Sequence, residues 1–239
     1  MRDKVISVLM AVCLLISMYY LAKTAAQYTM TWRKGEEGSP VVVVDAGHGG
    51  DDPGKVGING ALEKEINLQI AFYVKEYLEA DGVHVVMTRN SDAGLYQKES
   101  GNKKVEDLKN RLALIDAAGA ALVVSIHQNS YTAESVHGAQ VFYYETSQEG
   151  ERAALLLQKQ LRKGVDPDNK RQAKKNSTYY LLKKSSVPTV IAECGFLSNG
   201  AEAEKLTQEE YQKQVAWNIA LAVGQYLRGV DADGKNGAE

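Results

Sequence analysis

The 239-residue sequence contains only two cysteines and almost no excess of charge. Cys13 lies in an apolar N-terminal run and Cys194 in a distant, different setting, so we predict no disulfide framework and infer no redox compartment. The formal net charge of −2 provides no basic surface of the kind that binds nucleic acid. Internal repeats and a second domain are also lacking, and the length suits one domain with a sizeable core.

One long uncharged run lies near the N-terminus, between Lys4 and Lys23. Its 18 residues, 5–22, would cover about 27 Å as a helix, which just spans the hydrocarbon core of a bilayer. The run is apolar on all sides, which argues against a buried soluble helix. We therefore predict a signal anchor or transmembrane helix over residues 1–23, in preference to a removed signal peptide, and a protein that is membrane-anchored or exported.

Short β-branched runs alternate with helical patterns from residue 41 onward. Apolar runs predict strands at 41–45, 84–89, 121–127, 138–144 and 188–194. Apolar residues at helical spacing predict helices at about 62–81, 105–118, 149–164 and 208–228. This alternation predicts an α/β fold, a single domain with a mainly parallel twisted sheet and helices on both faces. We assign the domain to residues 41–229, after a polar linker at 24–40 and before a flexible tail at 230–239.

The stretch VVVVDAGHGG at 41–50 combines a buried strand with a polar exit. Open α/β sheets bind ligands beyond the carboxyl ends of their strands. We therefore expect His48, His127 and Glu193, which end three apolar strands, to meet at one edge together with Glu63 from the first helix. Two histidines and a carboxylate suit catalytic zinc, and a further carboxyl can move protons. The spacing alone fits two structural histidines and two surface acids almost as well, because it is no local zinc motif.

Five separated motifs carry a family resemblance. They are VVVDAGHGGDDPG at 42–54, GALEKEINLQIA at 60–71, VVMTR at 85–89, VSIHQNS at 124–130 and AECGFLSN at 192–199. In this order they resemble the zinc-dependent N-acetylmuramoyl-L-alanine amidases of bacterial cell-wall lytic enzymes, over about residues 41–228. The resemblance implies that His48, Glu63 and His127 bind Zn²⁺ and that Glu193 is the catalytic glutamate. Glu63 is favoured over Glu65 because the family's ligand directly precedes a lysine.

The resemblance implies hydrolysis of the amide bond between N-acetylmuramic acid and L-alanine in peptidoglycan. The layout of one anchor, one linker and one domain is similar to the spore-cortex amidases of spore-forming bacteria. This similarity implies a role in muramic-δ-lactam formation and germination, with a deacetylase acting in the same pathway, on the cell-wall or cortex side of the membrane. The alternatives are a non-catalytic peptidoglycan-binding or activator protein, and a zinc peptidase acting on stem peptides.

Several further residues carry weaker expectations. We expect substrate binding by Asn129, Arg171 and Lys174, although the basic segment 165–178 is otherwise read as a solvated loop. Arg111 is expected to support the site. We expect His84 and His137 to be structural or surface residues, and Cys194 to be small and buried. Gln128 stands where family members usually have alanine, and we expect it to alter how the substrate fits. Residues 179–186 suit either a short strand or a helix.

Overall fold

The computed structural model describes residues 14, 16–19 and 38–232. The predicted anchor at 1–23 and the linker at 24–40 therefore lie largely outside the described residues, as does the tail beyond residue 232. Among the helices that are described, none combines the length and apolarity that a membrane span requires. The chain divides into two units, Met1–Ser39 and Pro40–Glu239, and the second contains all the named strands and helices.

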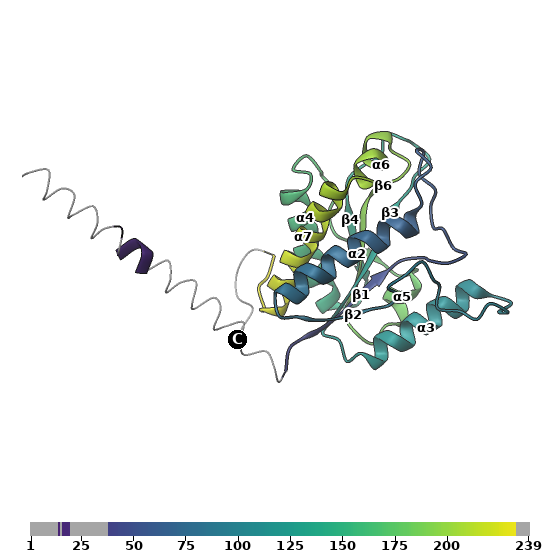
Figure 1. Ribbon diagram of the computed structural model, residues 1–239, viewed down its shortest axis with the longest axis horizontal. Helices are drawn as coiled ribbons and strands as arrows, with labels where there is room; N and C mark the ends of the chain where they lie inside the picture. The colour runs from purple at the N-terminus through teal and green to yellow at the C-terminus, as the bar shows by residue number, and fades with distance from the viewer. Residues whose placement is uncertain (1–13, 15, 20–37, 233–239) are drawn as a thin grey trace, which may run out of the picture. The chain divides into compact units, whose positions relative to one another are not determined.

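A six-stranded sheet forms the centre of the second unit, in the order β2-β1-β3-β6-β4-β5 (Figure 1). The strands are β1 (Val41–Ala46), β2 (His84–Met87), β3 (Leu122–Asn129), β4 (Gln140–Tyr144), β5 (Lys174–Asn176) and β6 (Thr189–Phe196). All neighbouring pairs are parallel except β4 and β6, which are antiparallel. The predicted α/β fold with a mainly parallel sheet is confirmed.

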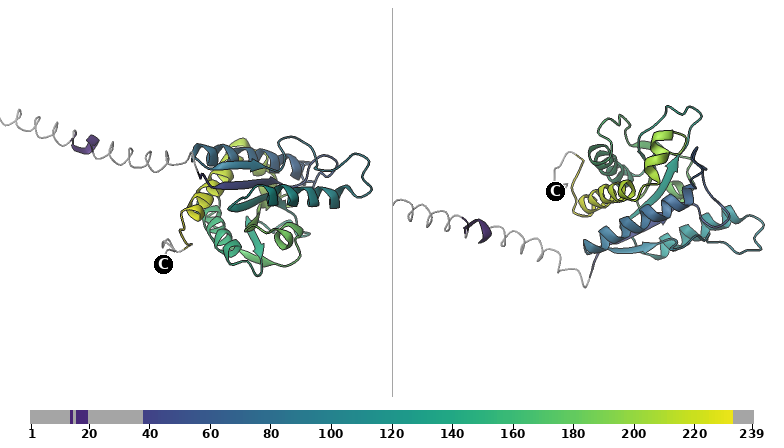
Figure 2. Two further views of the ribbon diagram at one scale, coloured as in Figure 1. Left: turned by 90° about the horizontal axis from the view of Figure 1, so that it is seen from below. Right: turned by 45° about the horizontal axis from the view of Figure 1, so that its top comes forward.

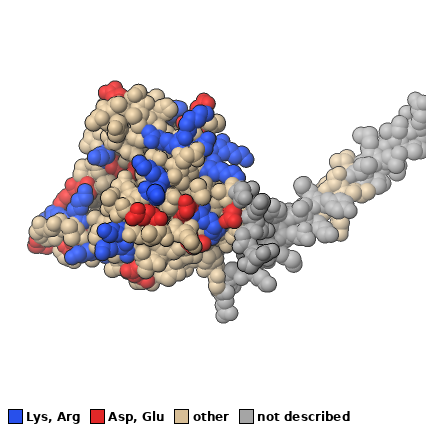
Figure 3. All heavy atoms as spheres, turned by 180° about the vertical axis from the view of Figure 1, so that it is seen from behind, with Lys and Arg blue, Asp and Glu red and all other residues tan. Residues whose placement is uncertain are grey.

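Helices cover both faces of this sheet. They are α2 (Glu63–Ala80), α3 (Lys103–Ala117), α4 (Gln148–Gly164), α5 (Tyr180–Lys184), α6 (Gly200–Leu206) and α7 (Glu209–Leu227). The views in Figures 1 and 2 show α4 and α7 running side by side, and α2 also contacts α7. On the face shown in Figure 3, acidic and basic side chains are interspersed, apart from one group of basic side chains at the upper right.

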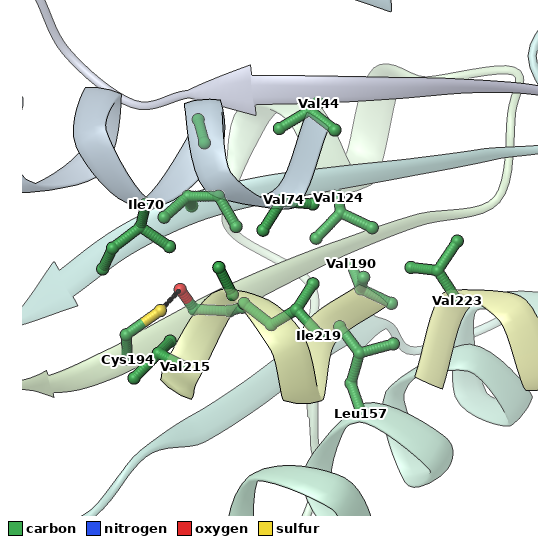
Figure 4. Packing of buried hydrophobic residues seen from close by; sticks show 14 of the residues in the cluster. Val44, Ile70, Val74, Val124, Leu157, Val190, Cys194, Val215, Ile219 and Val223 are labelled. Carbon is green, nitrogen blue, oxygen red and sulfur yellow. Dashed lines mark hydrogen bonds between the residues drawn. The ribbon is translucent and has the colours of Figure 1, made fainter. Parts of the chain in front are cut away.

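The valines of β1 explain why this strand lies in the middle of the molecule. Val42 and Val44 belong to the main core, which packs the sheet against α2, α4 and α7 (Figure 4). Val43 points to the opposite face, where it packs with Ile115 of α3 and Leu181 of α5. All three valines are completely buried, as expected for a strand covered on both faces. The carboxyl end of β1 is thereby placed on a rigid support.

The structure differs from the predicted elements at three short segments. Residues 179–186, which the pattern left open, contain the helix α5. The segment 165–178 is not all loop, because residues 174–176 form β5, whose exposed lysines gave no strand-like alternation. The seven-residue α6 was missed because it buries only two residues, too few to define a period.

Candidate metal centre

The four predicted site residues meet at the carboxyl edge of the sheet. His48 follows β1, and Glu63 is the first residue of α2. His127 of β3 and Glu193 of β6 are direct register partners on adjacent parallel strands. The expectation that these four residues lie together at one edge of the sheet is confirmed.

His48, Glu63 and His127 surround a common point. Oε1 of Glu63 lies 3.2 Å from Nε2 of His48 and 3.0 Å from Nδ1 of His127. One donor atom from each residue lies within 4.8 Å of the others. Glu65, the neighbouring acid, is exposed on the surface of α2. Two imidazoles and one carboxylate form a donor set that fits a catalytic zinc ion, and both histidine side chains are partly exposed to solvent.

The electrostatics of these three residues favour a positive charge at their centre. Burial opposes the ionisation of Glu63, but hydrogen bonds to His127 and His48 outweigh it and hold the pKa of the carboxyl well below its usual range. Burial lowers the pKa of His48, whereas Glu63 and Asp52 raise it, and the net shift is upward. An ionised carboxylate between two imidazoles attracts cations, and a divalent metal ion can satisfy all three ligands together.

A second carboxylate orients the first histidine. Nδ1 of His48 lies 2.9 Å from Oδ2 of Asp52, which leaves Nε2 to face Glu63. The other oxygen of Asp52 accepts a hydrogen bond from the backbone of Gly54 at 3.0 Å. Metal-binding histidines commonly hydrogen-bond through their second nitrogen to a carboxylate in this way. The ring of His48 is therefore preset with one nitrogen available at the site.

Two glycines leave space for the candidate ligands. A Cβ atom at Gly47 would collide with the imidazole ring of His127. At Gly54, where φ is +68°, a Cβ atom would lie 2.6 Å from Oε2 of Glu63 and 2.8 Å from Cδ2 of His48. The glycine-rich loop after β1 thus allows the backbone to approach these three side chains closely.

Glu193 differs from Glu63 in its surroundings. Its side chain is buried, and its Oε2 has no hydrogen-bond partner among the described residues. Burial raises the pKa of Glu193 to about 7; the charge of Glu63 adds to this shift and that of His127 opposes it. A carboxyl group with such a pKa can both accept and release a proton near neutral pH. This unpaired, protonatable group beside the histidines suits a general base rather than a further ligand.

A buried polar network lies beneath the site. Asp45, inside β1, accepts hydrogen bonds from Arg111 at 2.6 Å, from Thr88 at 2.7 Å and from Ser125 at 2.5 Å. Burial opposes ionisation of Asp45, but the charge of Arg111 and the hydrogen bond from Ser125 lower its pKa to about 2. Arg111 also donates to the carbonyl of His48, which supports the prediction that it assists the site.

Two residues near the site were not predicted from the sequence. Asp45 was not among the predicted site residues, although a charged residue at the end of a run of valines indicates a buried partner of opposite charge. Tyr179, just before α5, packs edge-to-face on Phe142 of β4. Burial raises the pKa of Tyr179, and the charges of Glu193 and Glu63 raise it further.

The weaker candidates lie at different positions around the site. Asn129 ends β3, two residues beyond His127. Arg171 donates to the carbonyl of His137 at 2.7 Å and to Oε1 of Gln140 at 3.1 Å, and its guanidinium lies over the ring of Phe196. Lys174 is exposed on the edge strand β5, two strands from β6.

The remaining candidates are structural or exposed, as predicted. His84 and His137 are exposed. Cys194 is completely buried, and burial raises the pKa of its thiol, so it is not an activated nucleophile.

Comparison with known proteins adds independent information. A family model described as N-acetylmuramoyl-L-alanine amidase (Amidase_3) matches residues 42–225. The germination-specific N-acetylmuramoyl-L-alanine amidase of Bacillus subtilis is 38% identical over 190 residues, which cover 78% of this chain and 79% of the relative. The CwlD amidase from Clostridioides difficile, solved in complex with the GerS lipoprotein, superposes with a TM-score of 0.77 at 39% identity, covering 79% of this chain and 98% of that one. AmiC2 of Nostoc punctiforme gives a TM-score of 0.69 at 33% identity, covering 80% and 99% of the two chains.

Proposed function

Because the chain belongs to the N-acetylmuramoyl-L-alanine amidase family, we propose that His48, Glu63 and His127 hold a catalytic zinc ion and that Glu193 is the general base. The protein is an N-acetylmuramoyl-L-alanine amidase that acts on peptidoglycan. The observation that carries the zinc assignment is the convergence of three donor atoms within 4.8 Å, with the unpaired carboxyl of Glu193 on the adjoining strand.

The reaction breaks the amide between the lactyl group of N-acetylmuramic acid and L-alanine of the stem peptide. When bound, zinc polarises the scissile carbonyl and lowers the pKa of a water toward ~7. Glu193 accepts a proton from the attacking water and delivers it to the leaving nitrogen, which its pKa of about 7 suits. His48, Glu63 and His127 would hold the ion in a fixed place, since Glu63 begins α2, His127 lies in β3 and His48 follows β1 by two residues.

Acidic groups of the stem peptide are the proposed partners of the basic residues near the site. Arg171 donates to Gln140 of β4, and Gln140 is the register partner of Glu193 on β6. Arg171 is therefore bound to the residue that lies opposite Glu193 in the sheet. Asn129 extends from the same strand as His127 and can hydrogen-bond to the substrate backbone. Lys174 lies farther away, on the edge strand, where it can reach only an extended substrate.

The spore cortex is the proposed site of action. This proposal is supported by the similarity to a germination-specific amidase. Removal of stem peptides would allow muramic-δ-lactam to form once a deacetylase has acted on the same muramic acid. Anchoring through residues 1–23 would place residues 41–229, the proposed catalytic domain, on the wall or cortex side of the membrane.

Digestion of purified peptidoglycan by the chain, with and without a zinc chelator, tests the proposal. The expected products are free L-alanine amino termini and intact glycan strands, and the chelator should abolish their release. Wall binding without cleavage would instead favour the non-catalytic binding protein. Products that retain L-alanine on muramic acid would favour the zinc peptidase.

The variant Glu193→Gln separates metal binding from catalysis. We expect it to bind one zinc ion with the affinity of the wild type and to lose turnover by at least ~100-fold. His127→Ala, as the matched comparison, should lose zinc as well, measured by elemental analysis. Unchanged turnover in Glu193→Gln would contradict the assigned role.

A further inference from the structure

The side chain of Gln128 lies in the protein interior beside the proposed zinc ligands. It is 2% exposed and directly follows His127 in β3. Its Nε2 donates a hydrogen bond of 3.2 Å to Oδ1 of Asn67, a completely buried residue of α2. Asn67 in turn lies one helical turn after Glu63. The sequence predicts that Gln128 alters substrate fit, whereas the structure places its amide against a second amide next to a metal ligand.

The orientation of the Asn67 amide is determined by its neighbours. Its Nδ2 donates to the backbone carbonyl of Gly47 at 3.2 Å and to Oε1 of Glu63 at 3.3 Å. Because two acceptors face this nitrogen, the amide oxygen of Asn67 has to point the other way. There it accepts the hydrogen bond from Gln128. Without that donor, a buried oxygen would be unpaired and the amide would lose the contact that keeps it oriented.

Glu63 receives hydrogen bonds at both carboxylate oxygens. In addition to the bond from Asn67, Oε1 accepts the backbone N–H of Gln128 at 3.1 Å. Oε2 accepts the backbone N–H of Lys55 at 2.7 Å. Apart from the two histidines, Asn67 supplies the only side-chain donor among these contacts of Glu63, since the other two donors are backbone groups. The orientation of Glu63 is therefore open to change through Asn67 and through Gln128, which holds Asn67.

Gln128 is a costly residue at this position if only stability is considered. Its Oε1 is buried and has no hydrogen-bond partner among the described residues. The neighbouring thiol of Cys194 donates to the carbonyl of Ala192 instead. Leaving a polar atom unpaired in the interior opposes folding. The Nε2 of Gln128, by contrast, donates to Asn67, which in turn donates to Glu63. This contact indicates that Gln128 acts on the proposed metal ligand Glu63.

We propose that Gln128 is a positioning residue of the metal centre, which orients Asn67 so that Asn67 can orient the carboxylate of Glu63. This inference rests on the proposed zinc site. Loss of a group that holds a metal ligand typically weakens metal affinity by ~10–100-fold. Gln128 therefore contributes to zinc affinity without touching the ion or the substrate.

The test measures zinc dissociation constants by competition with a chromophoric chelator, so it requires no turnover. The variants are Gln128→Met, which keeps the length of the side chain but removes the amide, Asn67→Ala, and the double variant. We expect each single variant to weaken zinc binding by ~10-fold or more. The double variant should bind zinc no more weakly than Asn67→Ala alone, because Gln128 acts through Asn67.

Gln158→Met is the matched control. Gln158 is also 2% exposed, and its amide makes two hydrogen bonds, with the carbonyl of Ala139 and the N–H of Val141, neither of which belongs to a proposed zinc ligand. This variant should lower thermal stability and leave zinc affinity unchanged, which separates a general packing defect from a defect at the ligand.

Two results would overturn the inference. One is an unchanged zinc dissociation constant in Gln128→Met. The other is a double variant whose loss equals the product of the two single losses, which would mean that the residues act independently. A wild-type protein that binds zinc but releases no L-alanine termini would contradict the proposed function, while the dissociation constants would still decide the role of Gln128.

Discussion

Arg111 donates a hydrogen bond of 2.6 Å from its Nη2 to the backbone carbonyl of His48. His48 has a φ of 62°, the only positive φ of a non-glycine residue among those the structure describes. Such a conformation is uncommon outside glycine and needs support from its surroundings. Arg111 supplies this support from α3, where its Nε also pairs with Asp107 at 2.6 Å. A buried cation thus fixes the backbone that carries a proposed metal ligand.

Replacing Arg111 should therefore destabilise the protein strongly. Arg111→Met would leave the charge of Asp45 buried and unpaired, which typically costs about 3–5 kcal/mol. We expect urea denaturation to give a decrease of this size, together with weaker zinc binding. Arg152→Met is the control, because Arg152 pairs with the half-exposed Glu149 and should cost less than about 1 kcal/mol. Equal losses in the two variants would contradict the role of the buried pair.

Asp45 should make stability depend on acid pH. Its pKa is about 2 in the folded protein and about 3.9 in an unfolded chain, so its contribution is present above pH ~4 and is lost as the pH falls through ~2. The free energy of unfolding should fall by about 2 kcal/mol more in the wild type than in Asp45→Asn between pH ~5 and ~2. Parallel pH curves for the two proteins would exclude this contribution.

Gly47→Ala should damage the metal centre rather than the fold as a whole. The added methyl group would collide with the ring of His127, which would have to move away from Glu63. We expect a loss of about 1–3 kcal/mol in stability and at least ~10-fold weaker zinc binding. Gly101→Ala is the matched control, since a Cβ atom there meets no neighbour. A zinc affinity of Gly47→Ala equal to that of the wild type would show that His127 keeps its place despite the added methyl group, and would contradict the prediction.

Glu193 should titrate near neutral pH in the metal-free protein. Burial raises its pKa to about 7, so half of the groups should remain protonated at that pH. Infrared difference spectra should show this carboxylic acid band in the wild type and not in Glu193→Gln. A bound zinc ion should lower the midpoint because its positive charge favours the carboxylate. A band that disappears already between pH 4 and 5 without metal would show that burial does not control this group.

Removal of zinc should lower the thermal stability of the protein. A ligand that binds only the folded state stabilises it by about 2.7 kcal/mol at 100 times its dissociation constant. The melting temperature should therefore fall when a chelator is added and recover with excess zinc. His127→Ala should show neither response, because it lacks one of the three proposed ligands. A chelator effect that persists in this variant would place the stabilising metal elsewhere.

Much of the fold could be predicted from local patterns. The valines at 42–44 identify a strand that is buried on both faces, and the apolar spacing of α2 and α7 identifies long helices. Short elements could not be predicted in this way. The strand β5 consists of polar, largely exposed residues, and its pairing with β4 depends on the edge that β4 presents. The antiparallel direction of β4 against β6 likewise carries no local pattern.

The sequence by itself determined which residues are available for chemistry at the site. The motifs around His48, Glu63, His127 and Glu193 name the amidase family, because each motif is a continuous segment that can be compared with relatives. Only the tertiary structure decided how these residues act on one another. Asp45 and Arg111 are 66 residues apart, and Asn67 and Gln128 are 61 residues apart, yet each pair shares a buried hydrogen bond. Such pairs form only when helices pack on the sheet, since side-chain direction and burial depend on elements that are distant in the sequence.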